Sequence, residues 1–160
     1  MVSTRAFSSI MESLTRTAEE KYYKGSIKYL IGIDEAGRGP LAGPVVAAAC
    51  IIRPDIAIPN IDGIKDSKAT TEAQREATYA KLINTPGVYW GVSVISAEKI
   101  DEINILQATL LAMRNSACSI LAENPQLQAQ EVLALVDGNK LPKDMPIACE
   151  YVIKGDAHIF

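Results

Sequence analysis

The chain has 160 residues, of which 48% are hydrophobic and 22% charged, and this is typical of a single globular domain. The composition excludes a largely disordered chain, and the longest apolar run, residues 44–52, is too short to cross a bilayer, so no membrane is expected. The net charge of −3 argues mildly against nucleic-acid binding, although a local basic strip can exist on an acidic protein.

The cysteines give no sign of a zinc site. They are far apart and odd in number, no CxxC motif occurs, and the chain has a single histidine, His158. We therefore expect reduced thiols and a cytoplasmic location. Residues 1–11 contain serines, Arg5 and no acidic residue, which leaves an organellar transit peptide as an alternative.

The hydrophobic pattern predicts a lead-in, residues 1–27, with a polar helix over residues 8–23, followed by one domain over residues 28–160. The elements predicted in that domain are, in chain order, strands 28–34 and 43–52, a helix over 71–84, a strand over 88–96, a helix over 103–121, and strands 132–136 and 149–153. This order predicts an α/β fold with a mixed five-stranded sheet.

Three of these elements carry specific signals. Thr71 and Gln74 have the spacing of a capping box at a helix start. Apolar residues at steps of three and four place one apolar stripe on the helix over 103–121, on which Asn104 and Gln107 have either structural or minor-groove roles. Residues 132–136 are apolar at every position, which is typical of a strand covered on both faces.

Three acidic residues follow or end apolar strands. Asp34 and Glu35 come at the end of the first strand, and Asp137 ends the strand over 132–136. Parallel strands present their carboxyl ends to a shared crevice, and we expect the turn at Gly37 to let Asp34 and Glu35 approach one point there. Three such carboxylates would need a hard cation, Mg²⁺ or Mn²⁺. The alternative is that each acid merely ends a strand, since strand ends are ordinarily polar.

A glycine-rich turn follows the first strand. Gly37, Gly39 and Gly43 lie within seven residues, which allows close backbone approach of a ligand, although a plain hairpin connection has the same composition. No Gly-Lys-Ser/Thr follows, so this is not a nucleoside-triphosphate loop. Two short motifs, at residues 66–68 and 154–156, contain Lys68 and Lys154, and each motif is weak by itself.

Taken together, these motifs carry a family resemblance. Residues 32–49, GIDEAGRGPLAGPVVAAA, resemble the signature of ribonuclease HII, and four further family stretches follow in the family's order, at residues 66–68, 100–109, 136–139 and 152–157. The turn reads Gly37-Arg38-Gly39, whereas ribonuclease HIII has Gly-Lys-Gly. The chain is thus identified as a member of the type 2 ribonuclease H family, over about residues 29–157.

The resemblance implies a ribonuclease H-like fold and an endonuclease that cuts the RNA strand of RNA–DNA hybrids and duplex DNA on the 5′ side of embedded ribonucleotides. Two-metal-ion catalysis would leave 3′-hydroxyl and 5′-phosphate ends. Asp34, Glu35 and Asp137 would be catalytic residues and ligands of Mg²⁺ or Mn²⁺. The turn Gly37-Arg38-Gly39 would sense the ribonucleotide's 2′-hydroxyl, and Lys68 and Lys154 would contact phosphates. No protein partner can be inferred.

The family pattern continues beyond the end of this chain with further helices, a fourth metal-binding aspartate and a tyrosine that stacks on the substrate sugar. We therefore expect a C-terminally incomplete domain, in which residues 132–136 and 152–153 lack part of their covering helix and leave an exposed apolar patch. The alternative function is an inactive fragment with at most weak metal or hybrid binding. A phosphatase-like or nucleotide-binding enzyme of the same fold class has no motif of its own here.

Overall fold

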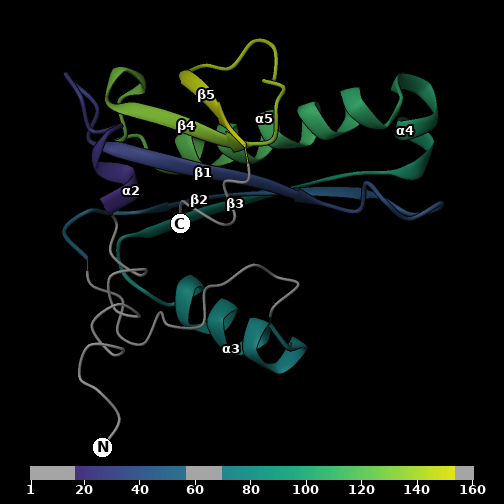
Figure 1. Ribbon diagram of the computed structural model, residues 1–160, viewed down its shortest axis with the longest axis horizontal. Coiled ribbons are helices and arrows are strands. Elements are labelled where there is room, and N and C mark those ends of the chain that lie inside the picture. The colour runs from purple at the N-terminus through teal and green to yellow at the C-terminus, as the bar shows by residue number, and fades with distance from the viewer. Residues whose placement is uncertain (1–16, 57–69, 154–160) are drawn as a thin grey trace, which may run out of the picture.

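The computed structural model describes residues 17–56 and 70–153, in which five strands form one mixed sheet flanked by helices (Figure 1). The strands are β1 (Tyr29–Ala36), β2 (Val45–Ile52), β3 (Val88–Ile95), β4 (Val132–Asp137) and β5 (Ala148–Val152). Their order across the sheet is β3-β2-β1-β4-β5. Strand β2 is antiparallel to β1 and β3, whereas β4 is parallel to β1 and β5. The predicted α/β class and mixed five-stranded sheet are therefore confirmed.

Strand β1 extends further than predicted, through Glu35 to Ala36 rather than ending at Asp34. The cause is pairing with β2, which continues to the pair Ala36 and Val46. Because the backbone stays extended through both acidic residues, their side chains follow the strand's alternation between the two faces of the sheet.

The described helices are α2 (Thr17–Glu20), α3 (Glu72–Ile83), α4 (Ala97–Ile103), α5 (Ile105–Glu123) and the short 3₁₀ helix η2 (Ala129–Glu131). The capping box at the start of α3 is confirmed, since the Gln74 backbone N–H donates to Thr71 and the Thr71 backbone N–H donates to the Gln74 side chain. Of the polar lead-in helix predicted over residues 8–23, the structure describes the part from residue 17 onward, where the helix ends at Glu20.

The helix predicted over residues 103–121 corresponds to α5, and Asn104 separates it from α4, a helix that was not predicted. Asn104 has a φ of 65°, a left-handed conformation that asparagine tolerates better than most residues. Its backbone N–H donates to Ile100 at the end of α4, and its side-chain oxygen accepts from the Gln107 backbone N–H, 3.1 Å away, at the start of α5. Of the two roles expected for Asn104, the structure supports the structural one.

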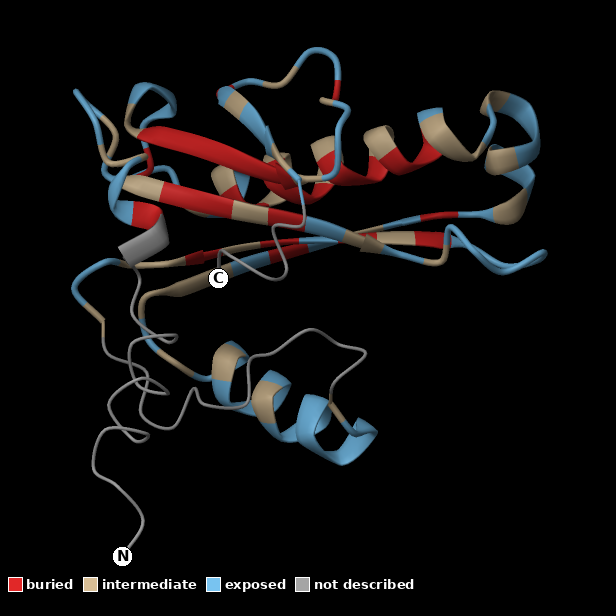
Figure 2. Cartoon of the chain, viewed as in Figure 1, coloured by how far each residue is buried: buried red, intermediate tan, exposed pale blue. Residues whose placement is uncertain are grey.

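Helix α5 supplies one side of the main core (Figure 2). Its buried face packs against alternate residues of β2, namely Val45, Ala47, Ala49 and Ile51. Among the described helices, α5 is long and apolar enough to cross a membrane by length and composition, which is a weak signal. Its packing along the sheet instead accounts for this composition, because a core helix buries the same kind of face.

Strand β4 is buried at all five positions from residue 132 to residue 136, as predicted. One face lies in the main core. The other face of β4 is covered, contrary to expectation, because Leu133 and Leu135 pack with Leu30 and with the lead-in residues Tyr22, Tyr23 and Ile27. Ile153, just after β5, is 67% exposed, as the expected apolar patch requires.

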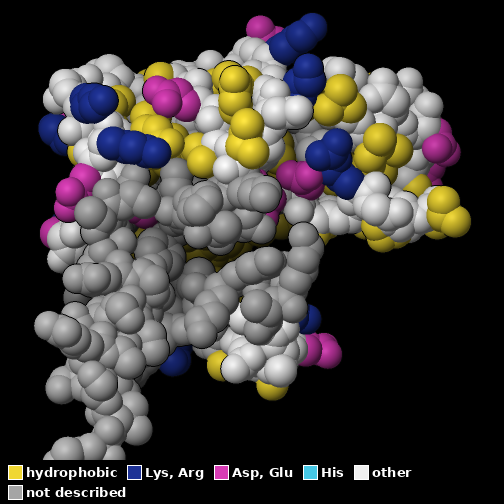
Figure 3. Space-filling model, in the orientation of Figure 1, with side chains coloured by type: hydrophobic (Ala, Val, Ile, Leu, Met, Phe, Trp, Pro, Cys, Tyr) yellow, Lys and Arg dark blue, Asp and Glu magenta, His cyan; other side chains and the backbone are white. Residues whose placement is uncertain are grey.

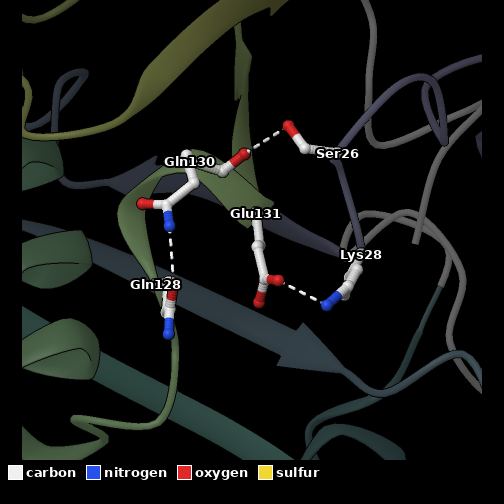
Figure 4. Close-up of polar contacts among 5 residues, drawn as sticks. All are labelled: Ser26, Lys28, Gln128, Gln130 and Glu131. Carbon is white, nitrogen blue, oxygen red and sulfur yellow. Dashed lines mark hydrogen bonds and ion pairs between the residues drawn. The ribbon is translucent and has the colours of Figure 1, made fainter.

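Polar contacts attach the lead-in beside η2 (Figure 4). The Ser26 hydroxyl donates to the Gln130 carbonyl oxygen at 2.8 Å, and the Lys28 ammonium forms an ion pair with Glu131. The hydrogen bond and the charge of Glu131 raise the pKa of Lys28 above its ordinary value. These contacts, together with the packing of the tyrosines, join the end of the lead-in to the sheet.

The sheet surface formed by β3 on the side away from α5 is open to solvent. Trp90, Val92 and Val94 are 45%, 50% and 60% exposed. Helix α3, which lies below the sheet in Figure 1, has no buried residue and is drawn mainly as exposed in Figure 2. This β3 surface is therefore apolar and about half exposed, and no helix within residues 17–56 and 70–153 buries it.

Candidate functional site

Asp34 and Asp137 lie side by side on adjacent parallel strands. The register of β1 and β4 pairs Ile33 with Val136, and Asp34 and Asp137 are the next residue on each strand. Asp34 is four residues after Leu30 on β1, and Asp137 is two residues after Leu135 on β4. Because every second residue of a strand points to the same face, both aspartates project from the face of the sheet that carries these leucines. Asp34 is exposed and Asp137 half-buried. The structure thus brings together two of the three predicted carboxylates.

Glu35 has a different setting. It pairs across the sheet with Ala47, whose side chain is buried in the core beneath α5, so Glu35 lies on the face opposite to Asp34. Its Oε1 accepts a hydrogen bond from Arg38 Nη1 at 3.0 Å, in an ion pair. The Glu35 backbone N–H, in contrast, donates to Asp34 Oδ1 at 2.7 Å.

The expected approach of Asp34 and Glu35 to one point is therefore absent in this structure. The strand-to-turn transition was expected to bring them together, but the extended backbone of β1 separates their side chains. Within residues 17–56 and 70–153, no group of three or more histidine, cysteine, aspartate or glutamate side chains is placed to hold a metal ion. That Glu35 joins the two aspartates on a cation stays a prediction.

The two glycines of the turn Gly37-Arg38-Gly39 have different surroundings. Gly37 has a φ of +96°, and a β-carbon there would lie 2.5 Å from the Pro44 carbonyl oxygen, so the fold itself requires glycine. Gly39 has no such φ, and no atom lies within 4 Å of the position of its β-carbon. The backbone at Gly39 is open to an approaching molecule, as the ligand-binding interpretation of this turn requires.

The remaining predicted site residues cannot be placed relative to the two aspartates. Lys68 and Lys154, with their short motifs, lie outside the described residues. Of the motif at residues 152–157, the structure describes residues 152 and 153, which lie beside Asp137. Val152 pairs with Asp137, and its carbonyl oxygen accepts a 3.0 Å hydrogen bond from the Gly138 backbone N–H. The two lysines stay predictions.

Charge on the described surface is mixed. On the face drawn in Figure 3, lysine and arginine side chains are scattered among acidic and apolar ones and form no continuous basic strip. The ion pair between Arg38 and Glu35 was not predicted from the sequence, although both residues were predicted site residues. Opposite charges three residues apart, across a glycine turn, are the sequence signal that could have indicated it.

The family model of ribonuclease HII matches residues 31–159. The chain is 48% identical over 128 residues to ribonuclease HII of Dechloromonas aromatica, covering 80% of this chain and 59% of that protein. It is 43% identical over 153 residues to ribonuclease HII of Chlamydia pneumoniae, covering 95% of this chain and 66% of that protein. The chain thus spans about 60% of the length of these relatives.

Solved structures match the fold. A mutant of Bst-RNase HIII has a TM-score of 0.67 at 17% identity, covering 89% of this chain and 50% of that one. Bst-RNase HIII was also solved in complex with Mn²⁺, with a TM-score of 0.64 at 17% identity. The ribonuclease H2 from Pyrococcus horikoshii has a TM-score of 0.53 at 28% identity, covering 81% of this chain and 64% of that one. The sheet described above is therefore of the ribonuclease H-like type.

Proposed function

The chain belongs to the ribonuclease HII family, and from this premise we propose that it hydrolyses the RNA strand of RNA–DNA hybrids. We further propose that it cuts duplex DNA on the 5′ side of embedded ribonucleotides and leaves 3′-hydroxyl and 5′-phosphate ends. The chain spans 59% of the Dechloromonas relative, so the activity of the 160-residue chain itself is part of this proposal.

The observation that carries the proposal is the pairing of Asp34 with Asp137. Two carboxylates in register on β1 and β4, at the carboxyl ends of parallel strands, lie where α/β folds bind their ligands. Two neighbouring carboxylates on one face also repel each other, and a cation between them would remove that repulsion. The pair can therefore hold a cation at the carboxyl ends of β1 and β4, where a substrate would bind.

The donor set fits a hard divalent cation. Asp34 and Asp137 offer carboxylate oxygens, which are the ligands that Mg²⁺ and Mn²⁺ take, and Glu35 is the proposed third ligand. When bound, such cations activate a water for attack on phosphorus and stabilise the charge that develops on the leaving oxygen. The protein's own contribution is to hold the two aspartates side by side on paired strands, so that little reorganisation of this pair is needed.

Recognition of RNA is assigned to the turn that follows β1. The open backbone at Gly39 allows a sugar to come close, and the 2′-hydroxyl is the chemical group that distinguishes RNA from DNA. Because the turn starts directly after the strand that carries Asp34, a ribonucleotide held there would lie near the cation-binding edge. Lys68 and Lys154 remain proposed phosphate contacts on their sequence motifs alone.

The test is a nicking assay on labelled duplexes, with the 160-residue chain and with a form extended to the length of the relatives. One duplex contains a single ribonucleotide, a second is an RNA–DNA hybrid, and a matched all-DNA duplex is the control. We expect the extended form to cleave the first two in Mg²⁺ or Mn²⁺, with no cleavage after chelation and loss of cleavage in Asp137→Asn. Equal cleavage of the all-DNA duplex would contradict the proposed recognition of the 2′-hydroxyl.

The alternative is an inactive fragment with at most weak metal or hybrid binding, and the chain spans 59% and 66% of the two relatives. A chimera that continues the chain with the C-terminal part of the Dechloromonas relative separates the two possibilities. Cleavage by the chimera alone would support the fragment alternative, whereas cleavage by both proteins at similar rates would support an active 160-residue chain.

A further inference from the structure

We propose that Lys140 and Lys143, on the loop that follows β4, bind phosphate groups of the nucleic-acid backbone beside Asp34 and Asp137. This inference rests on the proposed function, because it takes a nucleic-acid duplex as the substrate. It adds two residues that lie outside the family motif over residues 136–139 and have no role in the carboxylate pair.

The loop over residues 138–147 begins at the site. It follows Asp137 directly and connects the carboxyl end of β4 to the start of β5 (Figure 1). Ligands of α/β folds bind in the crevice outside the carboxyl ends of the strands, so the first residues of this loop border that crevice. Lys140 comes three residues after Asp137, a length of chain that spans at most about 11 Å, and for Lys143 the limit is about 22 Å. Lys140 can therefore reach a phosphate beside the aspartates, and Lys143 one further along the strand.

Contacts on its inner side fix this loop to the rest of the domain. Leu141 and Ile147 pack against the main core, and Pro142 is buried. The Arg114 Nε of α5 donates a hydrogen bond to the Asp144 carbonyl oxygen at 3.0 Å. An anchored loop holds its exposed side chains near fixed positions, so less of the chain has to be ordered when a substrate binds.

Both lysines are exposed, and their charges are not neutralised by an ion pair. Within the described residues 17–56 and 70–153, the basic residues that form ion pairs with acidic side chains are Lys28, Arg38, Arg53 and Lys99. Asp144 follows Lys143 in the sequence, but no ion pair joins them in this part of the chain. An ammonium group without an acidic partner keeps its three N–H donors available for phosphate oxygens.

Contacts of this kind would position the duplex and leave recognition of RNA to the turn after β1. Phosphates are the same in RNA and DNA, so the two lysines would add affinity and orientation but no selectivity. Each lysine would meet one phosphate, and such contacts need no continuous basic strip on the surface.

The experiment measures binding of a labelled RNA–DNA hybrid by fluorescence anisotropy over a series of salt concentrations. EDTA is present, so that no divalent cation takes part, and both the 160-residue chain and the extended form are used. The variants are Lys140→Gln, Lys143→Gln and the two combined. Lys81→Gln is the matched control, because Lys81 is also exposed but lies on α3, below the sheet in Figure 1, whereas the loop lies above it.

We expect each single loop variant to bind the hybrid about threefold to tenfold more weakly at about 0.1 M salt. The slope of log affinity against log salt concentration should fall in magnitude by about 0.9 for each lysine, because one phosphate contact and the counterions that it releases are lost. Lys81→Gln should keep the affinity and the slope of the wild type. The melting temperatures of the loop variants should not change, since both side chains are exposed.

An all-DNA duplex of the same sequence separates phosphate contacts from recognition of the sugar. The loop variants should lose affinity for this duplex by the same factor as for the hybrid. Wild-type affinity and slope in the double variant would overturn the proposal, and so would an equal loss in Lys81→Gln, which would show an effect of net charge alone. If neither wild-type form binds the hybrid, the proposed function itself fails, and the two failures are thus distinguishable.

Discussion

Gly91 of β3 lies directly beneath Ser116 of α5, so closely that a β-carbon at position 91 would overlap the Ser116 carbonyl oxygen and the Ser119 hydroxyl. Both serine side chains turn back onto their own helix, where Ser116 donates to the Met113 carbonyl and Ser119 to the Ser116 carbonyl, each at 2.8 Å. The absence of a side chain at Gly91 and the short serine side chains therefore allow α5 to lie close to the sheet.

Gly91→Ala should destabilise the protein by about 1–3 kcal/mol, the usual cost of adding a carbon to a filled interior. The Ser119 side chain can rotate away, but the Ser116 carbonyl belongs to the helix backbone and has to move with α5. Urea unfolding followed by circular dichroism measures the effect. Gly39→Ala is the control, because its β-carbon meets no atom within 4 Å and its stability should change by less than about 0.5 kcal/mol. Equal stability of the two variants would contradict this packing.

Substitutions of the two turn glycines should act differently. Gly37→Ala should lower the free energy of unfolding, since the new side chain meets the Pro44 carbonyl and the backbone has a positive φ. Gly39→Ala should leave folding and Mn²⁺ affinity unchanged but reduce cleavage next to a ribonucleotide, because only an approaching substrate would meet the added methyl group. Cleavage and unfolding assays on both variants test this. Wild-type cleavage by Gly39→Ala would show that the backbone at Gly39 is not approached closely.

Asp34→Asn and Asp137→Asn should each weaken Mn²⁺ binding by about tenfold or more, because even the loss of a residue that only supports a metal ligand commonly costs that much. The substitutions conserve shape, so the far-ultraviolet circular dichroism should be unchanged. Asp101→Asn, at an exposed position on α4, is the control for net charge. Calorimetry gives the affinities. Unchanged affinity in both Asp34→Asn and Asp137→Asn would exclude them as the cation ligands.

Trp90, the only tryptophan of the chain, reports on the open surface of β3. With 45% of the residue exposed, its fluorescence should be quenched by acrylamide with an efficiency between that of a free indole and that of a buried one. Stern–Volmer plots for the folded protein, for the chain unfolded in guanidinium and for N-acetyltryptophanamide provide the comparison. A folded protein that resists quenching would mean that this surface is covered in solution.

Local signals in the sequence anticipated most of the fold. The capping box of Thr71 and Gln74, the apolar run over residues 132–136 and the turn residues between strands each depend on near neighbours, and the structure contains each of them. The order of strands and helices then left few arrangements other than a mixed α/β sheet. The motifs over residues 32–49 and 136–139 also indicated the family, which the comparisons confirm.

The tertiary structure decided how these elements face one another. Pairing with β2 keeps β1 extended through Glu35. The Glu35 side chain therefore lies on the face of the sheet opposite to Asp34, where it forms an ion pair with Arg38. The register of β1 and β4 brings Asp34 beside Asp137 across about a hundred residues of chain, a distance over which no sequence period operates. The requirement for glycine at position 37, but not at position 39, likewise depends on Pro44 contacting one position and nothing contacting the other. Sequence periodicity determines which side chains share a face of an element, whereas long-range packing determines what that face meets.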